Sequence, residues 1–385
     1  MTRAFSKLIH SASPKVCTDV AAWAIKRGCP IKTLHAAVID EVRPYINDDR
    51  VALEEFTTHR AVLERAQTLV MIEGATIRDM VGFVELPDGQ ICHEGNWWLP
   101  QLQDHPAYKR RFALKRRRLT GNIYSLLCLW APEFYHWFHD ILPRLETALR
   151  HLPADTTFLI NSDPKPWQLD SLTAFGIGPD RLEIQRGGTR TRVKRLWFAT
   201  PVGHTSLGSG VVIQKVANRL RRHFVPDDSK HTSHHRLYIS RRKAANRRIV
   251  NESEIRPLLE EHRFQTVLCE DLSLAEQVRL FARTTATIGG HGAGLTNLIY
   301  CMPDSFVGEI HIDGVPPAYL VMSLQLGMRF SRFKANMLAV GRSQVDMQVN
   351  TAAFGEWICD CLDPLRQAAS AQMKRLTQSI SQPRR

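Results

Sequence analysis

The stretch Ile288-Gly289-Gly290-His291-Gly292-Ala293-Gly294-Leu295-Thr296-Asn297 decides the fold, because it joins a strand end, a glycine-dense turn and a helix start. A β-branched run, Thr284–Ile288, precedes the turn, and a helix-compatible segment, Leu295–Cys301, follows it. Backbone N–H groups converge at such a turn and a helix N-terminus carries partial positive charge, so the pattern is typical of an anion site. Its glycines leave no Cβ to block a bound phosphate, and the side chains of His291 and Thr296 can add hydrogen bonds. The alternative is a plain strand-to-helix turn in which the glycines serve only tight packing.

Strands and helices alternate on both sides of this turn, which predicts an α/β fold with a largely parallel sheet. In the second half of the chain we expect helices over 252–262 and after Ser273, where Ser273 and Glu276 have the spacing of a capping box. This alternation of helices and strands is typical of a doubly wound nucleotide-binding domain. The expected strands, in chain order, are a buried strand over 120–130, then Thr157–Asn161, Val193–Phe198, Arg236–Ser240, Phe264–Leu268, 285–289 and Phe306–Ile310.

The chain has 385 residues, which exceeds one comfortable hydrophobic core and predicts two domains. Pattern changes along the sequence divide it into four parts. These are a mainly helical N-terminal extension (1–67), a first α/β domain (68–205), a second α/β domain (206–350) and a C-terminal helix with a basic tail (351–385).

The formal net charge of +13 requires a partner or a solvated basic surface. Basic residues are densest in 109–118, in 241–248 and in the tail. Nucleic acid, anionic lipid and phosphorylated small substrates all fit such a surface, but no nucleic-acid-binding module is recognisable. For the first and third blocks, plain solvated surface is the alternative.

Other sequence features exclude several classes of protein. The eight cysteines form no Cys-x-x-Cys pair and no zinc spacing, which favours reduced thiols in a cytoplasmic protein. No apolar run approaches the roughly 20 residues of a membrane span. The first fifteen residues have no continuous apolar core, so we expect no secretory signal.

Candidate ligand-binding residues follow three neighbouring strands of the second domain, at the edge where open α/β sheets bind ligands. Arg241, Arg242 and Arg247 follow one strand, and their guanidinium groups match diphosphate oxygens. The glycine turn follows a second strand. Glu309 ends a third, where a carboxylate can bind the two hydroxyls of a ribose. Surface arginines, a packing turn and a capping or ion-pairing glutamate are the corresponding structural alternatives.

Three segments carry a resemblance to a known family: HWFHDILPRL (136–145), YISRRKAANRRIVNE (238–252) and LSLAEQVRLFARTTATIGGHGAGLTNLIYCMPDSFVGEI (272–310). In this order they resemble glycosyltransferase family 61, the domain-of-unknown-function 563 group, whose bacterial members include capsule and lipopolysaccharide proteins. The resemblance covers about 120–345 and is strongest over 236–312. Residues 1 to about 67 lie outside it.

The resemblance implies a GT-B fold, with two Rossmann-like domains facing across a cleft, and transfer of a sugar with inversion. It implies that the C-terminal domain holds a nucleotide-sugar donor and the N-terminal domain a glycan acceptor. The residues that would bind the donor are Arg241, Arg242, Arg247, His291, Gly292, Ala293, Gly294, Leu295, Thr296, Asn297 and Glu309.

We expect no metal and no cofactor besides the nucleotide-sugar co-substrate. The sequence contains no Asp-x-Asp triplet, the usual holder of Mg²⁺ or Mn²⁺ in metal-dependent sugar transfer, so arginines and a helix dipole would stabilise the leaving diphosphate. An inverting transfer also needs a general base, for which the family motif offers His136, His139 and Asp140. A structural hydrogen bond at a helix start is the alternative role of this group.

The predicted function is therefore an inverting, metal-independent glycosyltransferase that modifies a polysaccharide, lipopolysaccharide or glycoprotein. We expect it in the cytoplasm, with peripheral contact to an anionic membrane through the basic blocks, and without nucleic acid as a partner. Two other functions stay open. An inactive nucleotide-sugar-binding protein would bind the donor without turnover, and a nucleic-acid-binding protein would show steep salt dependence of duplex binding.

Overall fold

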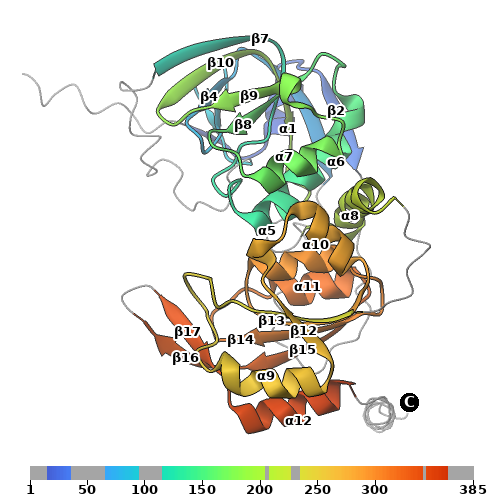
Figure 1. Ribbon diagram of the computed structural model, residues 1–385. Helices are drawn as coiled ribbons and strands as arrows, with labels where there is room; N and C mark the ends of the chain where they lie inside the picture. Colours follow the sequence, from blue (N-terminus) through green and yellow to red (C-terminus); the bar gives the residue numbers. More distant parts are fainter. Residues whose placement is uncertain are drawn as a thin grey trace, which may run out of the picture. The chain divides into compact units, whose positions relative to one another are not determined.

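The computed structural model describes residues 15–35, 66–94, 115–203, 208–226, 235–340 and 344–362 (Figure 1). They form two compact units. The first contains the described residues up to Pro226 together with Ser273–Val278, and the second contains the described parts of Asp227–Leu272 and of Arg279–Arg385. In the ranges described, no helix is both long and apolar enough to cross a membrane.

The first unit is built on a ten-stranded sheet with the order β1-β6-β5-β4-β10-β7-β8-β9, in which β3 pairs with β10 and β2 pairs with β3. Strands β10, β7, β8 and β9 are parallel neighbours, whereas β3 and β4 run antiparallel to β10. The sheet is therefore mixed, and only part of it has the predicted parallel arrangement. Its strands are β1 (Val16–Cys17), β2 (Ile31–His35), β3 (Gln67–Glu73), β4 (Thr76–Arg78), β5 (Phe83–Glu85), β6 (Ile91–Cys92), β7 (Lys115–Ser125), β8 (Thr157–Asn161), β9 (Leu182–Gln185) and β10 (Thr189–Ala199).

Of the predicted mainly helical N-terminal extension, 1–67, the structure describes 15–35 and 66–67. The part 15–35 contains one helix, α1 (Val20–Lys26), between two strands of the main sheet. Strand β1 pairs with β6 and β2 pairs with β3. Helix α1 is fixed to the turn after β5 because the Trp23 indole N–H donates to Asp88 over 2.9 Å. The described segment is part of the first unit, since its strands extend that sheet; the predicted extension over 36–65 lies outside the described residues.

The expected strand over 120–130 is displaced toward the N-terminus. Strand β7 begins at Lys115, inside the first basic block, and ends at Ser125. Its first residues alternate between exposed and half-buried positions, while Asn122–Tyr124 are buried. The basic residues thus occupy the outer end of a strand that is buried only at its inner end, and Arg117 there pairs with Glu183.

The α-helices described beside this sheet include α1, α5 (Phe134–His136), α6 (Leu142–Ala148), α7 (Pro166–Thr173) and α8 (Gly210–Phe224). A π-helical turn, Trp137–Ile141, connects α5 to α6. Arg219 of α8 forms an ion pair with Glu146 of α6 over 2.6 Å. Because α8 packs on α6 in this way, the first unit continues to Pro226, beyond the boundary near 206 that the sequence pattern predicts.

The second unit contains a five-stranded sheet, and every neighbouring pair in its order β12-β11-β13-β14-β15 is parallel. This confirms the parallel sheet predicted for this half of the chain. Figure 1 shows α9 and α12 side by side on one face of the sheet and α11 on the other. The elements are β11 (His235–Ile239), α9 (Glu252–Glu261), β12 (Phe264–Val267), β13 (Thr284–Gly290), β14 (Phe306–His311), α11 (Ala318–Gln325), β15 (Arg329–Lys334), the hairpin β16 (Asn336–Ala339) and β17 (Val345–Gln348), and α12 (Thr351–Leu362). Helix α10 (Leu274–Phe281) begins in the first unit, which includes Ser273–Val278, and ends in the second.

Local sequence signals in this half correspond to the observed structure. The Ser273 N–H donates to Glu276, and the Glu276 N–H donates to Ser273 Oγ, which is the capping box at the start of α10. The apolar face of α10 is buried, as its spacing predicts. One detail differs: the segment after the glycine turn is a 3₁₀ helix, Ala293–Tyr300, instead of an α-helix.

Candidate active site

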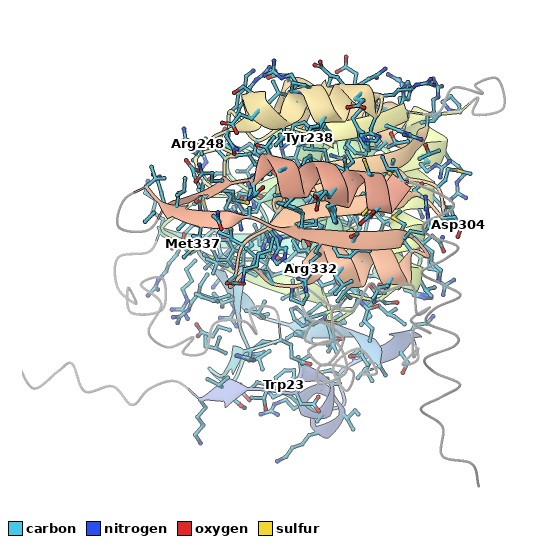
Figure 2. The ribbon with its side chains drawn as sticks, turned by 90° about the horizontal axis from the view of Figure 1, so that it is seen from below. Trp23, Tyr238, Arg248, Asp304, Arg332 and Met337 are labelled. Atoms are coloured by element: carbon cyan, nitrogen blue, oxygen red, sulfur yellow. The ribbon has the colours of Figure 1, made fainter. Side chains whose placement is uncertain are left out.

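The carboxyl ends of β11, β13 and β14 bring together the three sequence features predicted for the second unit. Gly289 of β13 lies beside Ile239 of β11 on one side and beside Glu309 of β14 on the other. Figure 2 labels Arg248 at one end of this unit and Asp304, which precedes β14, at the other. The arginine loop after β11 is therefore at the carboxyl edge, with the glycine turn.

The Arg241 side chain occupies the space that the glycines of the turn leave open. A Cβ on Gly292 would overlap its Nη1 atom, and a Cβ on Gly290 would lie 2.9 Å from its Cδ atom. Arg241 Nε donates to the carbonyl of Arg247 over 3.0 Å, and Nη2 donates to the carbonyl of Asn246 over 2.8 Å. The glycines at 290 and 292 are needed because a guanidinium, already fixed to its own loop, lies against the turn.

The arginines of the 241–248 block have different environments. Arg242 is exposed, whereas Arg247 is half-buried and has a left-handed backbone conformation, with φ of 57°. Arg248 forms an ion pair with the buried Asp346 of β17 over 2.7 Å. The Arg247 N–H donates to the carbonyl of Val345 over 2.7 Å, so β17 holds the loop in place.

Arg241 and Arg247 place two guanidinium groups within electrostatic range of one another. In the ranges that the structure describes, neither guanidinium forms an ion pair with a carboxylate, and Arg247 Nε is buried without a hydrogen-bond partner. Burial lowers the pKa of Arg241, and the charge of Arg247 lowers it further. Two neighbouring cations that destabilise one another in a partly buried place favour the binding of an anion.

His291 and Glu309 form a pair in the same unit. The ring N–H at His291 Nδ1 donates to Glu309 Oε1 over 2.5 Å. Glu309 is fully buried, and its second oxygen, Oε2, has no hydrogen-bond partner. The Tyr319 ring of α11 packs edge-on against His291, with 5.2 Å between ring centroids. The predicted contact of Glu309 with a ribose needs an accessible carboxylate, which this arrangement does not provide.

The remaining predicted donor residues are mostly buried. Leu295, Thr296 and Asn297 are 0–1 % exposed, whereas Ala293 is exposed. Asn297 donates to the carbonyl of Gly294 over 3.1 Å, which holds the turn in shape. The side chains of 295–297 thus stabilise the turn from inside, and the face available to a ligand is formed by Ala293, His291 and the arginines.

The first unit contains the second predicted group, His136, His139 and Asp140, which we name the histidine–aspartate cluster. His136 Nδ1 donates to Asp140 Oδ2 over 2.8 Å, and His139 Nδ1 lies 3.3 Å from Asp140 Oδ1. Both imidazoles contact the same carboxylate, His136 from four positions before it and His139 from the adjacent position, within and beside the π-helical turn.

The members of this cluster differ in exposure. The side chains of His136 and Asp140 are 21 % and 26 % exposed, whereas that of His139 is 1 % exposed. His139 packs under Tyr135, and its Nε2 atom is buried without a partner. Burial by itself raises the pKa of Asp140, but the hydrogen bonds from His136 and His139 outweigh it and lower the pKa well below the ordinary range. Asp140 is therefore ionised and accepts hydrogen bonds from both rings.

Residues 134–307 match the family model described as Glycosyltransferase 61. This part of the chain is similar to glycosyltransferase 61 domains. The match begins within the Phe134–His136 helix and ends in β14, so it includes the histidine–aspartate cluster, the arginine loop and the glycine turn, but not Glu309. It is narrower than the 120–345 that the sequence resemblance covers. No curated protein gave a significant match to the chain.

Two residues near the site were not identified from the sequence. Tyr319 contacts His291 but lies in a buried helix outside the family match, and no local pattern distinguishes it. Arg144 lies in the quoted motif, four residues after Asp140, where helical spacing places both on one side of a helix. It is 6 % exposed, and its Nε atom has no hydrogen-bond partner among the described residues, so the matched stretch contains a buried cation in the first unit.

Proposed function

We propose that the protein transfers a sugar from a nucleotide-activated donor to a glycan hydroxyl with inversion, using the two units as the halves of a GT-B enzyme. The family match supports a glycosyltransferase. The observation that carries the donor assignment is a pair of guanidinium groups at the carboxyl edge of a parallel sheet, Arg241 and Arg247, neither of which forms an ion pair with a carboxylate among the described residues. A diphosphate supplies the negative charge that these groups lack.

In this proposal, the histidine–aspartate cluster activates the acceptor. A general base works best when its pKa is near the working pH, and the lowered pKa of Asp140 makes that carboxylate a weak base. His139 is too buried to reach a substrate. His136, the partly exposed imidazole, is the base that we favour, with Asp140 orienting its ring through Nδ1.

The reaction then proceeds in one step. The acceptor oxygen attacks the anomeric carbon from the face opposite the diphosphate, and its proton passes to His136. The bond from the anomeric carbon to the diphosphate breaks, and the diphosphate leaves with the electron pair. Arg241 and Arg247 stabilise the charge that develops on it. We assign the acceptor to a surface polysaccharide or lipopolysaccharide, and the place of action to the cytoplasmic face of a membrane, on the basis of the family resemblance and the basic blocks.

Calorimetry with nucleoside diphosphates tests the donor site. Arg241→Ala and Arg247→Ala should each weaken binding by about 1.5–3 kcal/mol, the usual loss for a charge-assisted contact. Arg242→Ala gives the comparison within the same loop, since Arg242 is exposed and was predicted to share this role. Arg263→Ala is the control, because this arginine follows α9, away from the turn. Unchanged affinity in both Arg241 and Arg247 variants would reject the assignment.

The chelator EDTA tests the proposal that the reaction needs no metal. The arginines and the turn carry the charge stabilisation in our mechanism, so turnover should stay within about twofold when divalent ions are removed. An enzyme that loses all activity with EDTA and regains it with Mn²⁺ would show that a cation, and not these residues, stabilises the diphosphate.

A further inference from the structure

The pair of His291 and Glu309 is buried, so Glu309 cannot contact a ligand directly. Glu309 has no exposed surface, and His291 is 5 % exposed. Their contact joins β14 to the glycine turn across 18 positions of sequence. It forms because Gly289 and Glu309 are register partners on adjacent strands, which places the carboxylate beside the base of the turn.

The charge on this pair follows from its surroundings. A buried carboxylate is costly unless a positive group neutralises it, and Glu309 Oε2 accepts no hydrogen bond. The only cation in direct contact with Glu309, among the described residues, would be His291 in its protonated form. The other groups around the pair are Tyr319 of α11, Arg241 and Arg247, and burial keeps the Tyr319 phenol neutral by raising its pKa.

The two ring nitrogens of His291 have different environments. Nδ1 is occupied by Glu309, while Nε2 forms no hydrogen bond within the described ranges and is not enclosed like the carboxylate. When one ring nitrogen is held by a carboxylate, the ring orientation is fixed and the opposite nitrogen is directed to a ligand. His291 lies in the same turn as Gly292, against which the Arg241 guanidinium packs.

We propose that Glu309 is a positioning residue that keeps His291 protonated and oriented, so that His291 Nε2–H donates to the leaving phosphate of the donor. This inference rests on the proposed function and replaces the predicted contact of Glu309 with a ribose. The ligand group is a phosphate oxygen, which accepts the hydrogen bond from His291. Its negative charge also balances the protonated His291 ring, which lies near the positive charges of Arg241 and Arg247.

NMR of protein with isotope-labelled histidine tests the effect of Glu309 on the ring. The His291 signals are assigned among the 16 histidines by comparison with His291→Gln. We expect both His291 nitrogens to carry protons at neutral pH in the wild type, and only one in Glu309→Gln. The amide of this variant can still accept from Nδ1 but has no charge. A neutral His291 in the wild type, or an unchanged ring in Glu309→Gln, would overturn the proposal without reference to any sugar transfer.

A double-mutant cycle tests the path to the ligand, with calorimetry of a nucleoside diphosphate as the readout. Glu309→Gln and His291→Gln should each weaken binding about tenfold, which equals about 1.4 kcal/mol. The double variant should bind no worse than His291→Gln, because Glu309 acts only through the ring. Additive losses would mean that Glu309 acts on the ligand by another path.

Glu252→Gln is the matched control for the loss of a buried carboxylate in the same unit. Glu252 accepts from Ser240 Oγ over 2.8 Å and does not contact the glycine turn. It should lower the melting temperature and leave diphosphate affinity within twofold, whereas equal losses of affinity in both glutamate variants would assign Glu309 a merely structural role. A wild-type protein that binds no diphosphate would reject the proposed function, and the NMR result would still decide the relation of Glu309 to His291.

Discussion

The two histidine–carboxylate groups of this protein are built from the same side chains but differ in which partner is accessible. In the first unit, the carboxylate of Asp140 is 26 % exposed and accepts from two imidazoles. In the second unit, the carboxylate of Glu309 is fully buried and accepts from one. An exposed carboxylate can act on a substrate directly or orient a base, whereas a buried one can act only through its histidine. Accessibility, more than residue type, therefore separates the roles that we assign.

Asp140→Asn should have the largest effect, and it tests the role of the exposed carboxylate. If Asp140 orients His136 as the base, turnover should fall by about 10²–10⁴-fold, the range of general base catalysis. Diphosphate affinity, measured by calorimetry, should not change, because the arginines of the second unit bind that ligand.

Glu146→Gln is the control for this experiment, since it removes a carboxylate of α6 that pairs with Arg219. It should lower stability and leave turnover within severalfold. If Asp140→Asn retains normal turnover in a folded protein, the cluster is a structural hydrogen-bond group. His136→Ala and His139→Ala then show whether either imidazole contributes.

Arg144→Met should have an intermediate effect, with opposite signs for stability and activity. Arg144 is buried and forms no ion pair among the described residues, so its replacement by an apolar side chain of similar length removes a desolvation penalty, and the free energy of unfolding should rise by about 1 kcal/mol. Turnover should fall if the guanidinium serves the histidine–aspartate cluster beside it. Thermal unfolding and a transfer assay measure the two quantities.

Arg219→Met gives the reverse case in the same unit, because Arg219 has a carboxylate partner at 2.6 Å. It should lose stability, since Glu146 is left without its cation. A loss of stability in Arg144→Met as large as that in Arg219→Met would show that Arg144 supports the fold.

The smallest effect should be a change in how the free energy of unfolding depends on acidic pH in Asp140→Asn. The pKa of Asp140 is lower in the folded protein than its ordinary value of about 3.9 in unfolded chains. Its contribution to stability is therefore complete above that value and is lost as the pH falls toward the folded pKa. Asp140→Asn should make stability less dependent on pH below about pH 4, as measured by urea unfolding at a series of acidic pH values. An unchanged dependence on acidic pH would contradict the lowered pKa.

The same comparison shows what the sequence can predict. His136 and Asp140 are four positions apart, so helical spacing alone places them together. The capping box at Ser273 and the glycine turn are also local signals, and the structure contains both. The pairing of His291 with Glu309 depends on the register of β13 against β14, which no short pattern encodes.

Other features depend on long-range contacts in the same way. Strands β1 and β2 lie in the segment 1–67, for which the sequence pattern predicts mainly helical structure, and they form by pairing with β6 and β3. The burial of Glu309 was not foreseen either, since its position at a strand end suggested access to a ligand. The sequence thus identified the residues of the candidate site more readily than the role of each.

The strand pairings of β10 show that the stretch matched by the family model is not a complete folding unit. β10 lies inside the matched stretch 134–307, but its neighbours β3, β4 and β7 all come from residues before it. In the second unit, β15 and the hairpin that holds the arginine loop come from residues after it. A polypeptide trimmed to the matched stretch would expose unpaired edges on both sheets and should aggregate. The matched stretch contains most of the candidate site residues, and strands outside it are still required for the chain to reach its native state.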